Sequence, residues 1–143
     1  MTAAESKVEY VQIESGKGLP DIERFAPFKA VLAVEDATDD TRRNEICDWL
    51  VGMGARYVMV CGDDCQAWVD ALRAANLRQV DIDSMQAEQF VMITAHHGER
   101  LRSVFWHAKK HARHTHVDLR HTLAIHLGEQ NRSIEYLSLY DKA

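Results

Sequence analysis

Four short runs of apolar residues constrain the fold of this chain more than any other feature. They are Phe28–Val34, Tyr57–Cys61, Phe90–Thr94 and Thr122–Leu127. A strand with one solvated face alternates apolar and polar residues, whereas these runs are apolar almost throughout. Such strands are buried on both faces, which is typical of a parallel sheet covered by helices.

The segments between the runs have the periodicity of amphipathic helices. A first helix is expected to begin within Thr38–Thr41, whose side chains can cap it, and to end at Gly54. A second follows Asp64, a third spans about residues 99–113, and residues 131–140 form a last helix or a terminal strand. This alternation predicts an α/β fold, a small doubly wound sandwich of about four mainly parallel strands with helices on both faces.

The length of 143 residues suits one domain. Residues 1–27 are interpreted as an N-terminal arm, because glycines and prolines interrupt them after a possible short strand at residues 8–13. Residues 28–143 then form a single α/β domain. The segment 77–89 alternates only briefly, which predicts a short edge strand or an ordered loop.

Composition indicates a protein of the cytoplasm. No apolar run is long enough to cross a bilayer, and residues 1–6 lack the features of a secretory signal. Cys47, Cys61 and Cys65 are odd in number and have no redox or zinc spacing, so we expect free thiols. Cys65 lies on the apolar stripe of its helix and is expected in the core.

Charge is divided unevenly along the chain. Residues 1–95 contain 9 Lys and Arg against 17 Asp and Glu, whereas residues 96–143 contain 8 against 5. An acidic part beside a basic part favours electrostatic choice of a partner. The alternative is that the two parts neutralise each other within one fold.

Polar side chains follow the predicted strands at their carboxyl ends, where open parallel sheets bind ligands. We call this set the rim: Glu35, Asp36, Asp63, Asp64, Thr94, His96, His97 and His126. Carboxylates and imidazoles in one place could bind a divalent cation or transfer protons. The alternative is that they only cap helices and turns, since strand ends are usually polar.

All eight histidines lie between residues 96 and 126, and several fall on the third helix. A candidate surface for a partner or an anion includes Arg100, Trp106, His107, Lys109, Lys110, His111, Arg113 and His114. His107 and His111 are spaced to chelate a metal, but the neighbouring cations disfavour it. Trp106 is expected to project away from the core, as tryptophans at interfaces do.

Several segments resemble a small uncharacterised bacterial family of α/β domains. They are Cys47–Leu50, Gly62 with Asp64, Cys65 and Trp68, Phe90–Met92 with His96 or His97, Val104–Lys109, His114, Val117–Leu119 and Thr122–His126. The resemblance covers most of the chain from Phe28 onward. It implies a free-standing α/β domain and assigns no catalytic residue.

These observations favour a cytoplasmic binding or regulatory module that acts through a protein partner or as a homo-oligomer. No cofactor is predicted, because no glycine-rich phosphate loop follows a strand. One alternative is a metal-dependent hydrolase or phosphoesterase built on Asp36, Asp63, His96, His97 and His126. Another is binding of an anion through the basic third helix; nucleic acid is disfavoured in an acidic protein, and no membrane segment is present.

Overall fold

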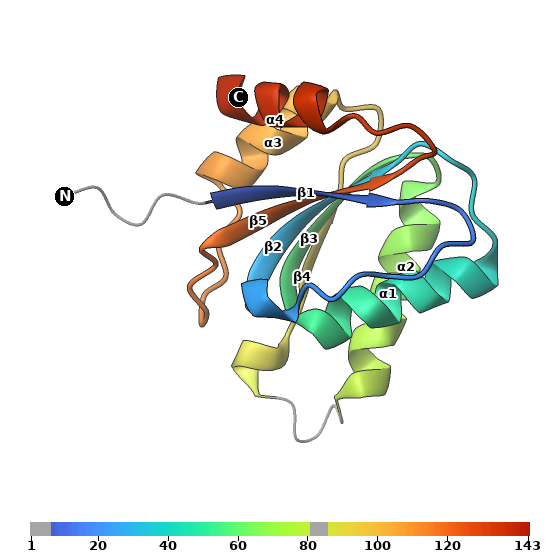
Figure 1. Cartoon of the computed structure of the whole chain (residues 1–143). Coiled ribbons are helices and arrows are strands. Elements are labelled where there is room, and N and C mark those ends of the chain that lie inside the picture. The colour runs from blue at the N-terminus through green and yellow to red at the C-terminus, as the bar shows by residue number, and fades with distance from the viewer. Residues whose placement is uncertain (1–6, 81–85) are drawn as a thin grey trace.

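Five parallel strands form a single sheet in the order β1-β5-β2-β3-β4 (Figure 1). The computed structural model describes residues 7–80 and 86–143. The strands are β1 (Lys7–Ile13), β2 (Phe28–Val34), β3 (Ala55–Gly62), β4 (Met92–Ala95) and β5 (His121–Leu127). The predicted α/β class is confirmed, with one strand more than expected.

The central strands are buried because their neighbours cover both edges and helices cover both faces. Every residue of β2 is buried, and all but the first of β5 are as well. Val31 of β2 lies between Met59 of β3 and Ala124 of β5 in the hydrogen-bonded register. The absence of a polar face in these runs thus reflects their position in the middle of the sheet.

Four helices complete the sandwich: α1 (Asp40–Met53), α2 (Cys65–Gln79), α3 (Leu101–Lys110) and α4 (Ser133–Lys142). Asp39 caps α1 by accepting a hydrogen bond from the Arg42 main-chain nitrogen at 2.8 Å. Gly54 ends α1 at φ 113°, and a Cβ there would lie 2.3 Å from the Ala26 Cβ. Only glycine fits this position.

Each face of the sheet has its own apolar core. Helices α1 and α2 pack on one face, around Leu32, Leu50 and Trp68, and helices α3 and α4 pack on the other, around Val31 and Phe105 (Figure 1). The prediction of helices on both faces is therefore confirmed. Within the described residues, no helix is both long enough and apolar enough to span a bilayer.

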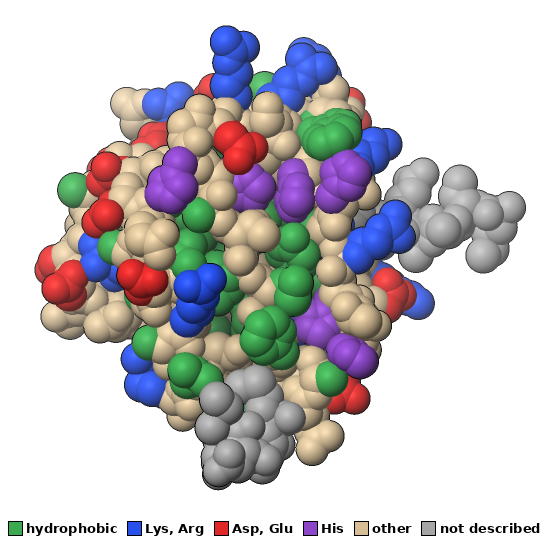
Figure 2. All heavy atoms as spheres, turned by 180° about the vertical axis from the view of Figure 1, so that it is seen from behind, with side chains coloured by type: hydrophobic (Ala, Val, Ile, Leu, Met, Phe, Trp, Pro, Cys, Tyr) green, Lys and Arg blue, Asp and Glu red, His purple; other side chains and the backbone are tan. Residues whose placement is uncertain are grey.

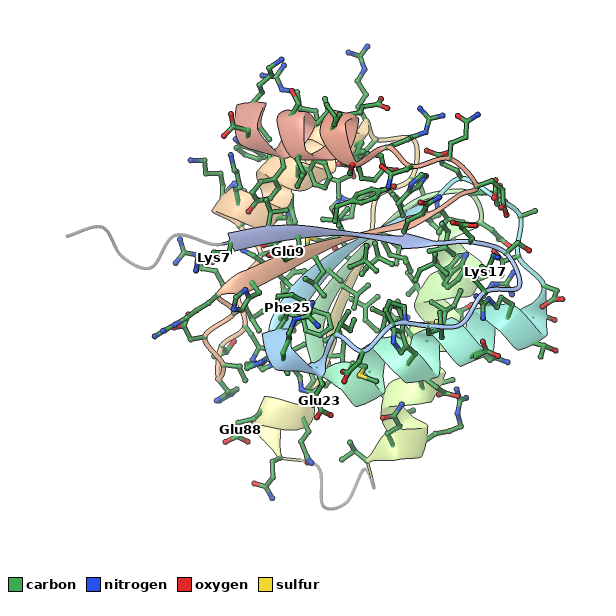
Figure 3. All side chains as sticks on the ribbon, in the orientation of Figure 1. Lys7, Glu9, Lys17, Glu23, Phe25 and Glu88 are labelled. Atoms are coloured by element: carbon green, nitrogen blue, oxygen red, sulfur yellow. The ribbon has the colours of Figure 1, made fainter. Side chains whose placement is uncertain are left out.

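The segment expected as an arm contributes a strand to the sheet. Strand β1 pairs in parallel with β5 over its whole length, from Lys7 opposite His121 to Ile13 opposite Leu127. A short 3-10 helix, η1 (Glu23–Phe25), follows, and the Phe25 ring packs on His121 with centroids 5.3 Å apart (Figure 3). The possible short strand at residues 8–13 is therefore present, as strand β1.

Helix α3 ends earlier than the expected Arg113. The Ala108 carbonyl accepts from the Lys29 ammonium and not from the Ala112 amide. The Ala112 amide instead reaches back to His107 at 3.0 Å. Regular α-helical bonding stops here, and Arg113 and His114 lie beyond the helix.

The remaining elements settle the expectation for the last segment of the chain. Residues 133–142 are helical, so the alternative of a terminal strand is wrong. In the segment 77–89, residues 81–85 lie outside the described residues. Helix α2 occupies the beginning of that segment, and a 3-10 helix, η2 (Ala87–Gln89), occupies its end.

Candidate functional site

The topology brings the rim residues to one edge of the sheet. Because all five strands run in the same direction, the residues that follow β2, β3, β4 and β5 emerge at the same carboxyl edge. Contacts along this edge nevertheless divide the rim into an inner cluster at β2 and β5 and an outer cluster at β4.

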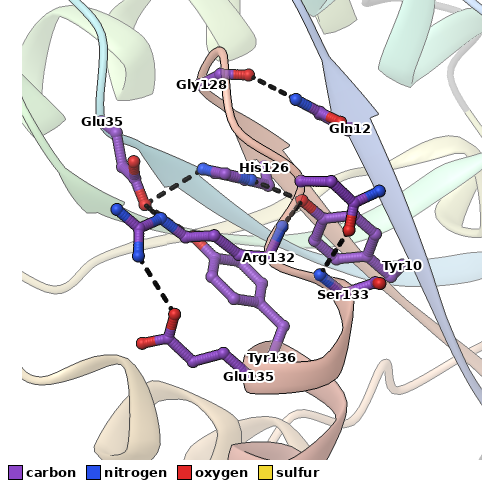
Figure 4. Close-up of polar contacts among 10 residues, drawn as sticks. Tyr10, Gln12, Glu35, His126, Gly128, Arg132, Ser133, Glu135 and Tyr136 are labelled. Carbon is purple, nitrogen blue, oxygen red and sulfur yellow. Dashed lines mark hydrogen bonds and ion pairs between the residues drawn. The ribbon is translucent and has the colours of Figure 1, made fainter.

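The inner cluster is centred on His126, which is fully buried in β5. The hydroxyl of Tyr10, from β1, lies 2.6 Å from His126 Nδ1. The carboxylate of Glu35, just after β2, lies 3.0 Å from His126 Nε2 (Figure 4). Three neighbouring strands are thereby connected through one imidazole.

Two residues from the start of α4 complete the inner cluster. Arg132 Nε lies 3.0 Å from Glu35 Oε1, and the Arg132 main-chain nitrogen donates to the Tyr10 hydroxyl at 3.0 Å. The Tyr136 hydroxyl donates to Glu35 Oε1 at 3.4 Å. Glu35 is the negatively charged member of this group. Burial is the main cause that raises the pKa of Tyr136, and the charge of Glu35 is the second.

The hydrogen-bond pattern favours one tautomer of His126. The Tyr10 oxygen accepts from Arg132, so its own hydrogen is free to be donated to Nδ1 of the imidazole. The ring proton then lies on Nε2, facing Glu35. Nε2 lies within ion-pair distance of the Glu35 carboxylate, but the geometry does not satisfy a hydrogen bond. His126 Nε2 has no other hydrogen-bond partner among the described residues.

The inner cluster lies where ligand crevices of open α/β sheets form. The chain leaves β2 toward α1 on one face and leaves the neighbouring β5 toward α4 on the other. A cavity of about 150 Å³ opens here between the ends of β1 and β5 and the loop into α1, with Ser15, Asp36, Arg42 and Gly128 in its lining. It is smaller than the usual pockets for organic ligands, about 300–1,000 Å³, and suits water or a small ion.

The outer cluster lies at the end of β4. His96, which is 6% exposed, has the Thr94 hydroxyl 2.7 Å from its Nε2 and the Glu99 carboxylate 2.9 Å from its Nδ1. The His107 ring of α3 packs edge-on against His96 with centroids 5.0 Å apart, and its Nε2 lies 3.2 Å from the Tyr57 hydroxyl. Burial and the charge of His96 lower the pKa of His107.

The remaining rim residues join neither cluster. Asp64, at φ 56°, pairs with Arg43 of α1 at 3.3 Å. Asp36, Asp63 and His97 make no side-chain hydrogen bond with any described residue. Within residues 7–80 and 86–143, no three His, Cys, Asp or Glu side chains are close enough together to hold a metal ion. The geometry therefore lends no support to the metal-dependent hydrolase.

The candidate surface of the third helix is also divided. His107 points inward to the outer cluster, whereas Trp106 is 48% exposed and packs against His111 with centroids 4.7 Å apart. The Lys109 ammonium contacts main-chain oxygens of Asp141 and Ala143, both at 3.3 Å. Arg100 and Lys110 are exposed, and Arg113 and His114 follow the helix.

Sequence reasoning did not find Tyr10, Arg132 or Tyr136. Tyr10 and His126 are 116 residues apart, and no local pattern connects them. One signal was available: the apolar positions of residues 8–13 fit a strand, and a strand beside β5 would have placed Tyr10 near His126. Cys65 is 2% exposed, and all three cysteines are free and buried, as expected from the sequence.

These features define an all-parallel α/β domain with two histidine clusters at its carboxyl edge. Residues 8–143 match the family described as Domain of unknown function (DUF7684), so the chain belongs to that family. The predicted resemblance to an uncharacterised family is thereby confirmed. No curated protein and no solved structure matches the chain.

Proposed function

We propose that this protein is a cytoplasmic binding module that docks an extended segment of a partner protein along the β4 edge of its sheet. The observation that carries the proposal is an exposed apolar groove beside β4. The three free thiols fit the reducing compartment.

The groove lies between α2 and β4 and has a volume of about 400 Å³. Its lining is Arg73, Asn76, Leu77, Phe90, Val91, Met92 and Ile93. Leu77 is 53% exposed and Phe90 48% exposed. The face seen in Figure 2 carries hydrophobic side chains at its centre, with histidines nearby. Contiguous apolar surface of this kind is a common feature of protein interaction sites.

The two edges of the sheet differ in a way that supports this assignment. Strand β1 carries the exposed charges of Lys7 and Glu9 (Figure 3), and charged side chains on an edge discourage pairing with other chains. Strand β4 instead begins with exposed Met92, two residues after exposed Phe90. Among the described strands, β4 pairs only with β3, and its other side is where the proposed segment would add as a strand.

Charge indicates what the partner segment contains. Among the described residues that line the groove, Arg73 is the only charged one, and its guanidinium makes no ion pair with a described carboxylate. A segment that adds to β4 through main-chain hydrogen bonds would place apolar side chains against Leu77 and Ile93. One carboxylate in that segment would complement Arg73. The expected partner is therefore an extended, mainly apolar segment with an acidic residue.

Binding of short synthetic peptides tests this function. Fluorescence polarisation compares a Val- and Ile-rich peptide that carries one Glu with the same peptide carrying Lys and with a proline-interrupted version. We expect the Glu peptide to bind roughly tenfold more tightly than the Lys peptide. Leu77→Glu should abolish binding, and Arg73→Glu should reverse the preference. Arg100→Glu, an equal change of charge at an exposed residue outside the groove, is the matched control.

Two results would contradict the proposal. Equal affinity for the Glu and Lys peptides would remove the role of Arg73. A concentration-dependent dimer in sedimentation experiments, dissociated by Leu77→Glu, would show that a second copy of the chain occupies the groove in place of an acidic segment.

A further inference from the structure

A second concave surface lies at the opposite, amino-terminal edge of the sheet. It is a cavity of about 710 Å³ between the beginning of β2, the end of α3 and the loop that leads into β5. Its lining is Lys29, Lys109, Ala112, Arg113, His114, Thr115, His116, Val117, Asp118, Leu119 and Arg120. This volume is within the range of pockets that bind organic ligands.

Positive charge dominates the cavity. Its lining includes four Lys and Arg residues and two histidines, against one carboxylate. That carboxylate, Asp118, is paired with Arg120 at 2.9 Å. Lys29 and Arg113 make no ion pair with any described carboxylate, whereas the Lys109 ammonium is engaged by main-chain oxygens at the end of α4. The excess of positive charge is thus not neutralised within the described fold.

Lys29 forms a built, buried part of this lining. Lys29 is only 5% exposed and is the one charged residue of strand β2, which is otherwise apolar. The ammonium donates to the Ala108 carbonyl and, at 3.4 Å, to the Ala112 carbonyl. A lysine has three N–H donors, so the third is available to a molecule in the cavity. Burial and the nearby Arg113 guanidinium lower the pKa of Lys29.

A bound anion would relieve an unfavourable arrangement. Buried charges in proteins are ordinarily paired with an opposite charge, but Lys29 has only carbonyl acceptors and another cation nearby. A phosphate group has the charge and the number of acceptor oxygens to bridge an ammonium and a guanidinium, which can bind it in a bidentate manner.

We propose that this cavity binds a small phosphorylated molecule, with Lys29 and Arg113 holding the phosphate group. His114 helps to shape the cavity wall: its Nε2 lies 2.8 Å from the Phe90 carbonyl oxygen, and its Nδ1 accepts from the His116 main-chain nitrogen at 3.1 Å. Concavity favours a small ligand over a nucleic acid, because the Lys29 ammonium lies at a buried position that a compact phosphate monoester can approach. No residue lines both this cavity and the β4 groove, although His114 of the cavity contacts the Phe90 carbonyl of the groove at 2.8 Å.

Calorimetric titration and amide chemical shifts test the site with AMP, inorganic phosphate and adenosine as probes. We expect AMP and phosphate to bind and to shift amides of residues 112–120, and adenosine to have no effect. Arg113→Ala should weaken AMP binding at least about tenfold, because it removes a charge-assisted hydrogen bond. Arg100→Ala removes the same charge from an exposed position outside the cavity and should leave affinity unchanged.

Lys29→Met is the second variant, with loss of binding expected in folded protein. If it fails to fold, the contrast between the Arg113 and Arg100 variants still decides the outcome. Equal weakening by these two variants would overturn the proposal in favour of diffuse electrostatic attraction. Equal binding of adenosine and AMP would also overturn it, as would stronger binding of a single-stranded RNA that does not shift amides 112–120.

Discussion

The inner and outer clusters place a histidine between the same two kinds of group, yet they are assembled in opposite ways. Tyr10, His126 and Glu35 come from three strands or their ends, and Arg132 adds a fourth segment. Thr94, His96 and Glu99 lie within six consecutive residues of the chain. Similar local chemistry can therefore arise from long-range packing or from a single turn.

This difference assigns the clusters different roles in the fold. The inner cluster connects β1, β5, the end of β2 and α4, and its imidazole is fully buried. The outer cluster connects the end of β4 to the segment before α3, two neighbouring parts of the chain. The carboxylate side chains are similarly exposed, Glu35 at 39% and Glu99 at 44%, so the clusters differ in how many segments they join. Loss of the inner contacts should thus cost far more stability than loss of the outer ones.

The largest expected effect is that of His126→Ala. The substitution leaves a cavity at a fully buried position and removes the partner of Glu35 and Tyr10. We expect a loss of about 3 kcal/mol in the free energy of unfolding, measured by urea denaturation. His97→Ala, at an exposed histidine, should change it by no more than about 0.5 kcal/mol. Equal losses would show that the inner cluster has no special structural role.

Tyr10→Phe should have the next largest effect. It removes the hydroxyl that connects His126 Nδ1 with the Arg132 main-chain nitrogen while retaining the ring. We expect a loss of about 1 kcal/mol, and faster hydrogen exchange at the Arg132 amide. An unchanged exchange rate would contradict the proposed connection between β1 and α4.

Glu99→Gln should cost only about 0.5 kcal/mol, since contacts of exposed carboxylates contribute little. The glutamine retains an oxygen that can accept a hydrogen bond from His96. Urea denaturation at neutral pH provides the measurement. A loss as large as that of His126→Ala would eliminate the distinction between the two clusters.

The smallest effect concerns pH at the outer cluster. Because the pKa of His107 is lowered in the folded protein by burial, His96 and His111, the unfolded chain binds a proton first as pH falls. Stability should therefore decrease as pH falls below the ordinary histidine value of about 6.5, down to the lowered pKa. Thermal unfolding at several pH values should show a shallower decrease for His107→Gln. A steeper decrease of stability in the variant would contradict the prediction that His107 destabilises the folded protein at low pH.

Local signals in the sequence predicted much of the fold but only part of the site. The lack of a polar face identified the central strands, and the short separation of Thr94, His96 and Glu99 brought the outer residues into consideration together. The inner cluster depends on strand order. The pattern of residues 8–13 predicts a strand but does not predict that this strand lies beside β5.

Lys29 shows a second limit of sequence reasoning. Within an apolar run it looks like an ordinary interruption, but its ammonium reaches the carbonyls at the end of α3. This one long-range contact lies both at the end of that helix and in the lining of the cavity beside it. Periodicity along one strand or helix does not show that a side chain contacts an element in another layer of the fold.

The position of β1 beside β5 has a consequence for how the chain matures. Since synthesis proceeds from the amino end, β1 leaves the ribosome well before β5, the strand with which it pairs. His126, which contacts Tyr10, is synthesised 116 residues later. During that interval β5 does not yet cover the apolar side chains of Val8, Val11 and Ile13. Closure of such a distant pairing is slow, so the nascent chain should depend on chaperones until its last strand emerges.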